Sequence, residues 1–151
     1  SEIRSDVAPL NALIEKALKA GVQAAGNAIH AMRDPTRGGL ATTLNEIARQ
    51  SNLGMVIHEA TIPIHETVSA VCEMLGFDPL YMANEGKCLF FVDERYASRV
   101  LEAIRSTEYG AQAAVIGEVI AEHPQKVLLR TSVGSTRLLD MLSGEMLPRI
   151  C

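Results

Sequence analysis

The sequence lacks a block of like charges, an apolar run of membrane-spanning length and a leader-like start. Its formal net charge is −4 over 151 residues, and it has no basic patch of the kind that a general nucleic-acid binder carries. No apolar stretch approaches the roughly 20 residues that cross a bilayer. The polar start Ser-Glu-Ile-Arg-Ser-Asp is not typical of a signal peptide. We therefore expect a protein that binds neither nucleic acid nor membrane.

Cysteine is also scarce, and its spacing excludes two structural roles. The cysteines are Cys72, Cys88 and Cys151. This odd, widely spaced set forms neither a zinc pattern nor a disulfide framework, and the histidines do not recur at metal-ligand spacing either. We expect no metal ligands and a reducing, cytoplasmic location. We also expect Cys72 and Cys88 to be core residues, because both lie in apolar stretches.

The remaining composition is that of one ordinary globular domain. Hydrophobic residues make up 48% and charged residues 21% of the chain, which is long enough to bury a core. Apolar residues at helical spacing predict helices over 8–20, 39–50, 65–75 and 94–106. Short apolar runs predict strands at 28–32, 55–62, 80–83, 88–92, 115–121 and 126–131, with a last strand or turn at 134–139. The mixture predicts an α+β (α/β layered) domain over residues 1–142, a mixed sheet packed with about four helices.

One pair of predicted strands is joined by a candidate catalytic turn. The runs 80–83 and 88–92 flank Asn84-Glu85-Gly86-Lys87, which predicts a hairpin in which Gly86 takes a positive φ. A carboxylate held at such a tip can act as a general base if it faces a cleft. The alternative is that Glu85 and Lys87 are solvated turn residues without a chemical role.

A second motif, Asp34-Pro35-Thr36-Arg37-Gly38-Gly39, precedes the helix predicted at 39–50. Glycines let a backbone approach a ligand closely, and a helix start offers unpaired N–H groups, so this stretch can bind an anion such as phosphate. Arg37 could add a forked contact. The alternative is a turn and helix cap in which Asp34 or Thr36 is the capping residue. The motif is neither a P-loop nor a dinucleotide fingerprint.

The last residue of the sequence is Cys151, which follows Leu147-Pro148-Arg149-Ile150. Regular periodicity stops at Ser143, so we expect a flexible, extended tail over residues 143–151. Such a tail spans at most roughly 30 Å. An unperturbed thiol is only about 3% thiolate at pH 7. Cys151 is therefore better suited to being loaded by another enzyme than to acting unaided.

The two motifs and the C-terminal ending together resemble those of the HypE family, the carbamoyl dehydratases of nickel–iron hydrogenase maturation. The motif at 34–39 with the following Leu40-Ala41, the motif at 84–87 and the ending at 147–151 occur in the order and at the spacing of that family's C-terminal half. The Gly-rich motif is shared more widely, with aminoimidazole ribonucleotide synthetases and selenophosphate synthetases. The resemblance implies the C-terminal-domain fold of that superfamily, with an N-terminal ATP-binding domain that is absent from this chain.

The resemblance also implies a reaction and its participants. A carbamoyltransferase would load Cys151, ATP with Mg²⁺ would activate the carbamoyl group, and dehydration with Glu85 as base would leave a thiocyanate, the donor of a cyanide ligand. An iron-scaffold maturation complex would receive the cyanide. The residues expected near the phosphates are Asp34, Arg37, Gly38 and Gly39. Most of the ATP and Mg²⁺ site and the contacts of a homodimer would come from the absent domain, so the isolated chain is expected to be inactive.

Two other hypotheses remain open from the sequence. A non-catalytic carrier or docking module would present the thiol of Cys151 to partner proteins. A related ATP-dependent synthetase that acts on a small molecule would leave Cys151 unexplained. ATP hydrolysis that depends on Cys151 in a two-domain protein would favour the dehydratase over both.

Overall fold

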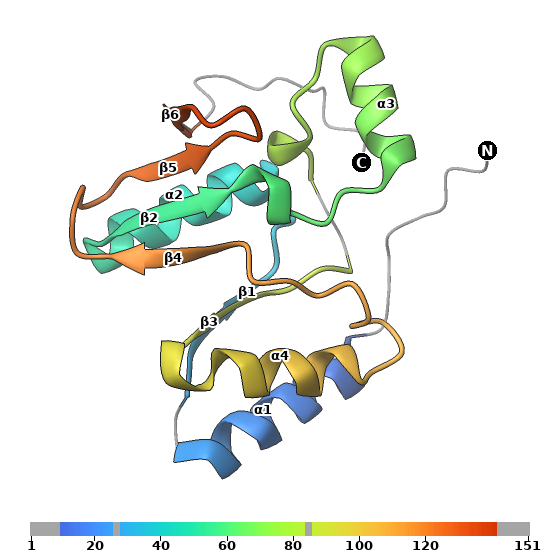
Figure 1. The fold of residues 1–151 in the computed structure, drawn as a ribbon, viewed down its shortest axis with the longest axis vertical. Helices are drawn as coiled ribbons and strands as arrows, with labels where there is room; N and C mark the ends of the chain where they lie inside the picture. Colours follow the sequence, from blue (N-terminus) through green and yellow to red (C-terminus); the bar gives the residue numbers. More distant parts are fainter. Residues whose placement is uncertain (1–9, 26–27, 84–85, 142–151) are drawn as a thin grey trace.

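The computed structural model describes residues 10–25, 28–83 and 86–141, which form helices and strands in two groups (Figure 1). The α-helices are α1 (Asn11–Ala25), α2 (Gly39–Ser51), α3 (Glu66–Leu75) and α4 (Ala97–Arg105). The strands are β1 (Ile29–Arg33), β2 (Gly54–His58), β3 (Leu89–Val92), β4 (Gly117–Ile120), β5 (Val127–Arg130) and β6 (Thr136–Leu138). Short 3₁₀-helices occur at η1 (Glu59–Thr61), η2 (Pro79–Tyr81) and η3 (Glu94–Tyr96). Within these ranges no helix is long and apolar enough to cross a membrane.

The larger sheet has four strands in the order β4-β2-β5-β6. It is mixed, as the sequence predicts, because β2 pairs antiparallel with β4 and parallel with β5, while β5 pairs antiparallel with β6. The parallel pair requires a long crossover, and α3, β3 and α4 lie in it. Helix α2 covers one face of this sheet (Figure 1). Its Leu40, Leu44 and Ala48 share a buried cluster with Met55 and Leu129 of the strands.

A separate antiparallel ribbon, formed by β1 and β3, lies between the large sheet and the helix pair α1–α4 (Figure 1). Successive side chains of a strand point to opposite faces, and β3 uses both faces. Leu89 and Phe91 pack against the buried cluster of α2 and the large sheet. Phe90 and Val92 pack against the buried cluster of α1 and α4. The ribbon therefore separates two hydrophobic cores.

The hairpin predicted from 80–83 and 88–92 is wrong. Residues Pro79–Tyr81 form η2, in which Asp78 accepts a hydrogen bond from the Leu80 amide. A proline at the first position favours this helical start, because it has no N–H to donate and its φ is already helical. The strand β3 pairs instead with β1, from a distant part of the sequence.

Other boundaries also differ from the predicted ones. Helix α1 continues through Gly21 to Ala25, because a glycine inside a helix costs only about 1 kcal/mol relative to alanine and does not by itself end the helix. Strand β2 ends at His58, where η1 begins. The strands β4 and β5 both pair with β2 rather than with each other. Helix α3 ends as predicted, at Gly76 with a φ of 71°.

Gly39 is expected to tolerate no side chain, for a reason of packing. Its φ is +66°, and an added Cβ would lie 2.5 Å from the carbonyl oxygen of Met82 and 2.7 Å from that of Leu80. Gly39→Ala should lower the free energy of unfolding in urea by about 2–3 kcal/mol. Gly76→Ala is the matched control, because Gly76 has a φ of +71° with nothing within 4 Å of its Cβ position. It should lose only about 1 kcal/mol, and equal losses at both positions would contradict a close contact at Gly39.

Candidate functional site

The structure brings the two sequence motifs to the same end of the β1–β3 ribbon. Arg33 pairs with Leu89 in the antiparallel register. Asp34 follows Arg33, the last residue of β1, and Cys88 precedes Leu89, the first residue of β3. Asp34 and Cys88 therefore lie at the same end of the ribbon. Burial chiefly raises the pKa of the Cys88 thiol, and the nearby Asp34 carboxylate adds to that rise. The segments at 34–39 and 86–88 are therefore neighbours.

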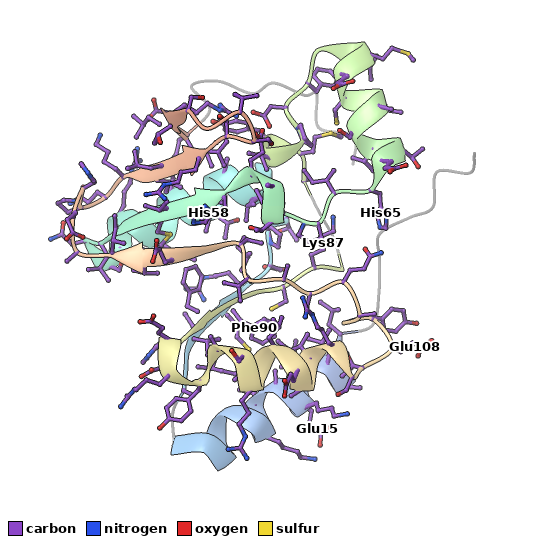
Figure 2. All side chains as sticks on the ribbon, viewed as in Figure 1. Glu15, His58, His65, Lys87, Phe90 and Glu108 are labelled. Atoms are coloured by element: carbon purple, nitrogen blue, oxygen red, sulfur yellow. The ribbon has the colours of Figure 1, made fainter. Side chains whose placement is uncertain are left out.

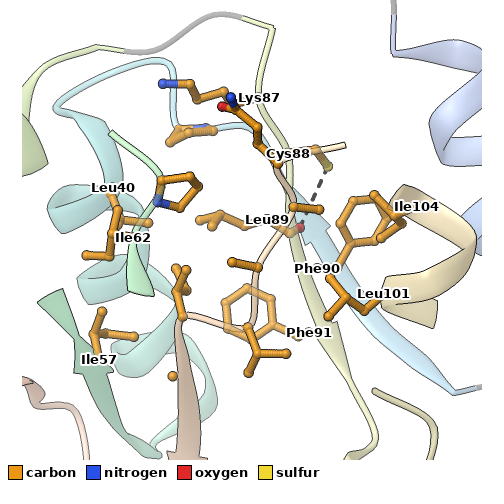
Figure 3. A pocket seen from close by; sticks show the side chains of 18 of the residues that line it. Leu40, Ile57, Ile62, Lys87, Cys88, Leu89, Phe90, Phe91, Leu101 and Ile104 are labelled. Carbon is orange, nitrogen blue, oxygen red and sulfur yellow. Dashed lines mark hydrogen bonds between the residues drawn. The ribbon is translucent and has the colours of Figure 1, made fainter. Parts of the chain in front are cut away.

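A cavity of about 760 Å³ lies at the junction of the two cores, and both motifs contribute to its wall. Pro35 comes from the first motif, and Gly86 and Lys87 come from the second. Figure 3 shows the apolar part of the wall, which includes Leu40, Ile57, Ile62, Leu89, Phe90, Phe91, Leu101 and Ile104. An apolar cavity of this size with a few polar groups is the usual form of a small-molecule site.

The charged side chains beside this cavity are exposed to solvent. They include Asp34 and Arg37 of the first motif and Lys87 of the second. Lys87 and the exposed His65 both line the cavity, and Figure 2 shows His65 where α3 begins and Lys87 just before β3. The carboxylates of Glu94 and Glu118 also line the cavity, so its charged groups are of both signs.

Helix α2 begins beside this cavity without a side-chain cap. Its N-cap residue is Gly38, which has a φ of 68°, and no described side chain accepts a hydrogen bond from the first amides. The alternative in which Asp34 or Thr36 caps the helix is therefore wrong. Amide groups that are not capped at a helix start can donate to an anion.

Packing explains why both positions at the start of α2 are glycine. A Cβ at Gly38 would collide with the side chain of Thr42, and one at Gly39 would collide with the backbone of residues 80–82. The Thr43 hydroxyl also donates a hydrogen bond to the carbonyl oxygen of Gly39 at 3.1 Å. The two glycines thus allow α2 to pack closely against η2. The prediction that they lie near the phosphates of ATP stays a prediction.

The two described cysteines differ in their surroundings. Cys72 is 2% exposed and belongs to the core, as predicted. Cys88 is only half-buried and lines the cavity, where its Sγ donates a weak hydrogen bond to the carbonyl oxygen of Leu89. Its raised pKa keeps the thiol protonated at neutral pH and makes it a poor nucleophile. In the part of the chain that the structure describes, no three His, Cys, Asp or Glu side chains are grouped to hold a metal ion.

The residues predicted to carry the chemistry, Glu85 and Cys151, lie outside the described residues, as do Asn84 and the predicted tail at 143–151. The structure does place Gly86, which has the predicted positive φ of 70° and lines the cavity. The residue that follows Glu85 in the sequence therefore lies in the cavity wall. The roles of Glu85 and Cys151 stay predictions.

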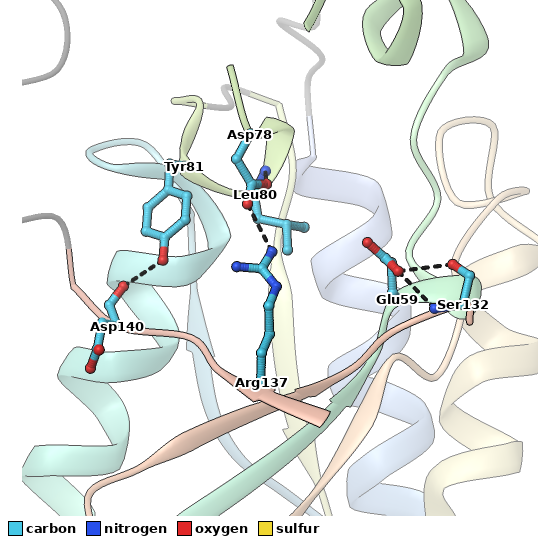
Figure 4. Close-up of polar contacts among 7 residues, drawn as sticks. All are labelled: Glu59, Asp78, Leu80, Tyr81, Ser132, Arg137 and Asp140. Carbon is cyan, nitrogen blue, oxygen red and sulfur yellow. Dashed lines mark hydrogen bonds and ion pairs between the residues drawn. The ribbon is translucent and has the colours of Figure 1, made fainter. Parts of the chain in front are cut away.

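Sequence reasoning missed the contacts that fix the C-terminal end of the described chain. The Tyr81 hydroxyl donates a hydrogen bond to the carbonyl oxygen of Asp140 at 2.7 Å. Arg137 forms an ion pair with Asp78 at 2.9 Å, and Figure 4 shows both contacts. No local signal could have revealed them, because each joins residues 59 positions apart.

The neighbouring Leu139 is anchored as well. Its side chain is 0% exposed, its amide donates to the carbonyl oxygen of Val127 at 2.8 Å, and its carbonyl oxygen accepts from the Asn45 side chain at 2.7 Å. Asn45 is itself 4% exposed and also donates to the carbonyl oxygen of Ala41. A buried amide with both protons bonded holds its partners in one arrangement. The chain therefore leaves the domain from a fixed point.

Comparisons with known proteins agree with this fold. The family described as AIR synthase related protein, C-terminal domain, matches residues 1–130. The carbamoyl dehydratase HypE of Bradyrhizobium diazoefficiens is 52% identical over all 151 residues, which correspond to 42% of that relative.

Two solved structures of HypE have the same arrangement. A crystal structure of a HypE–HypF complex matches with a TM-score of 0.85 and 44% identity, covering 94% of this chain and 44% of that one. HypE in complex with ATP matches with a TM-score of 0.86 and 43% identity, covering 99% of this chain and 44% of that one. The chain thus spans less than half the length of these relatives.

Proposed function

The chain belongs to the family of AIR synthase related proteins and corresponds to their C-terminal domain. We propose that it is part of a carbamoyl dehydratase of hydrogenase maturation. The similarity to carbamoyl dehydratase HypE over all 151 residues carries the proposal, because it spans residues 34–39, 84–87 and 147–151. The meeting of the first two segments at one cavity supports it. Since the chain corresponds to 42% of that relative, the activity would belong to a longer protein with a further domain.

The proposed reaction begins when a partner loads the thiol of Cys151. A carbamoyl group is transferred to Sγ, the thiol proton is lost, and the product is an S-carbamoyl thioester, –S–C(=O)–NH₂. The HypE of one solved structure is bound to HypF, and we propose a carbamoyltransferase of that kind as the partner. An ordinary thiol is mostly protonated at pH 7, so loading by an enzyme suits it.

ATP then makes the carbamoyl oxygen a leaving group. Transfer of the γ-phosphoryl group to that oxygen releases ADP and one N–H proton and leaves a C–O–P bond. A base, proposed to be Glu85, removes the second N–H proton as phosphate departs. One carbamoyl thioester and one ATP thus yield one thiocyanate, –S–C≡N, with ADP and phosphate. The cyano group would pass to iron on a scaffold complex as its cyanide ligand, with the Cys151 thiolate as the leaving group and the electron pair of the new iron–carbon bond supplied by the iron acceptor.

The phosphates of ATP would lie at the start of α2. Its first amides have no described side-chain cap, and the exposed Arg37 offers a fork of donors. Asp34, Gly38 and Gly39 belong to the same loop, and the HypE of a second solved structure binds ATP. Phosphoryl transfer in general uses Mg²⁺ and placed cations. We propose that Mg²⁺ arrives with ATP and that the rest of the longer protein supplies most of its ligands and the homodimer contacts.

The 151-residue chain alone is expected to fold but to hydrolyse ATP at under about a hundredth of the rate of the longer protein. Correct placement of reacting groups accounts for factors of this size, and the chain supplies one side of the site. Mg²⁺-dependent phosphate release from carbamoylated protein measures the rate, and a cooperative thermal transition confirms folding. Rapid turnover by the chain alone would contradict the two-domain proposal. Turnover by the longer protein that does not depend on Cys151 would favour a synthetase that acts on a small molecule, and the absence of any turnover would favour a carrier role.

A further inference from the structure

Two distant segments of the described chain run side by side and in the same direction. Nη2 of Arg137 lies 2.9 Å from Oδ2 of Asp78. Three residues further along each segment, the Tyr81 hydroxyl donates a hydrogen bond to the carbonyl oxygen of Asp140 at 2.7 Å. Both contacts join residues 59 positions apart, so the two segments are aligned residue by residue (Figure 4). We call 78–81 and 137–140 the paired segments.

Buried leucines between these two contacts fix the paired segments in the fold. Leu80 is 4% and Leu139 is 0% exposed, and both belong to the buried cluster that α2 forms with the large sheet. An exposed ion pair contributes little by itself, but here it is added to a packed core and a hydrogen bond. The alignment of the two segments is therefore a property of the core and not only of surface charges.

The first paired segment also contacts the helix start at which the phosphates of ATP are proposed to lie. A Cβ at Gly39 would lie 2.7 Å from the carbonyl oxygen of Leu80 and 2.5 Å from that of Met82. The backbone around Tyr81 thus packs directly against the first turn of α2. The η2 segment therefore contacts the start of α2 and the second paired segment at the same time.

Each paired segment leads to one of the two residues that are proposed to carry the chemistry. Glu85 follows Tyr81 by four residues, and Cys151 follows Asp140 by eleven. Stretches of these lengths span at most about 13 Å and about 36 Å. The proposed base and the thiol are therefore tethered to two points that one hydrogen bond joins. A tether of limited length keeps the local concentration of the group at its end high.

We propose that Tyr81 is a positioning residue for the dehydration step. Its hydroxyl holds the two tethering points together and so sets how Glu85 and the carbamoyl thioester on Cys151 approach each other beside the start of α2. Tyr81 acts through the segments that it joins and takes no part in the bond changes. A misplacement of about 1 Å that starts far from the reacting atoms can cost a large factor in rate. The inference rests on the proposed dehydratase function.

Tyr81→Phe tests this role, because phenylalanine keeps the ring and removes only the hydroxyl. In the full-length carbamoylated protein it should slow single-turnover dehydration about threefold to tenfold, the factor that corresponds to one hydrogen bond. Loading of Cys151 by the carbamoyltransferase and the affinity for ATP should be unchanged. Tyr96→Phe is the matched control, because it removes a tyrosine hydroxyl from η3, outside the paired segments. It should dehydrate the thioester at the parent rate.

A double variant separates positioning from a general loss of stability. In the Glu85→Gln protein no base is left to place, so adding Tyr81→Phe should slow dehydration no further. If the two losses multiply instead, Tyr81 acts on something other than the approach of the base, and the proposal is overturned. A parent rate in Glu85→Gln itself would overturn it as well, because Glu85 would then not be the base.

Hydrogen exchange tests the pairing without ATP or a carbamoyl group. In full-length Tyr81→Phe the amides of residues 137–140 should exchange about threefold to tenfold faster than in the parent, since Asp140 loses its partner. Unchanged exchange there, or an unchanged dehydration rate, would overturn the proposal. A parent protein that forms no thiocyanate would contradict the dehydratase function and this inference with it. An active parent with an unaffected variant would contradict the inference alone.

Discussion

Replacing Cys151 by alanine is expected to abolish thiocyanate formation in the full-length protein. Alanine has no sulfur, so no carbamoyl thioester can form and ATP has no group to activate. The residue lies outside the described fold, and the described cores do not depend on it, so the thermal transition should be unchanged. The measurement is the mass of the C-terminal peptide after incubation with the partner carbamoyltransferase, carbamoyl donor and Mg²⁺-ATP.

Cys88→Ala is the matched control for this experiment. Cys88 is a half-buried thiol beside the candidate site, and its raised pKa makes it unreactive at neutral pH. The variant should form thiocyanate at close to the parent rate. Activity that survived Cys151→Ala and disappeared with Cys88→Ala would transfer the carrier role from the C-terminal segment to the cavity wall.

Glu85→Gln is expected to slow dehydration of the loaded thiol by about 10²–10⁴-fold, the usual cost of losing a placed base. Glutamine keeps the shape of the side chain and removes its basicity, so ATP binding should change little. Carbamoylated protein carrying this change should retain the carbamoyl mass on Cys151 and accumulate little thiocyanate. Single-turnover mass spectrometry gives the rate, and ATP affinity is measured separately on the same sample.

Glu108→Gln provides the comparison, because Glu108 is an exposed carboxylate on the segment that follows α4. It removes the same charge from the same domain and should leave the rate within about twofold of the parent, since an exposed charge is screened by solvent and salt. Near-normal conversion by Glu85→Gln would reduce Glu85 to a turn residue. The base would then be sought in the N-terminal part of the longer protein.

Local patterns in the sequence predicted the helices, several strands and both motifs of the site. Helix α2 begins at the predicted residue, α3 ends at Gly76, and the mixed sheet with four helices is the predicted fold class, which the family match confirms. These features follow from apolar periodicity and from the freedom of glycine to take a positive φ, and both are properties of neighbouring residues. The motifs at 34–39 and 84–87 could also be recognised in the sequence, but nothing in the sequence indicated that they lie close together.

The pairing of the strands, and therefore the set of residues that meet, depends on how the whole chain packs. The local pattern of 80–92 favoured a hairpin, yet β3 pairs with β1. In that arrangement Leu89 and Phe91 pack against one core, and Phe90 and Val92 pack against the other. The same pairing places Asp34 beside Cys88. A local pattern can specify that a segment is extended, but the choice of its partner depends on the apolar area that the whole chain removes from water. The position of the candidate site follows from that choice.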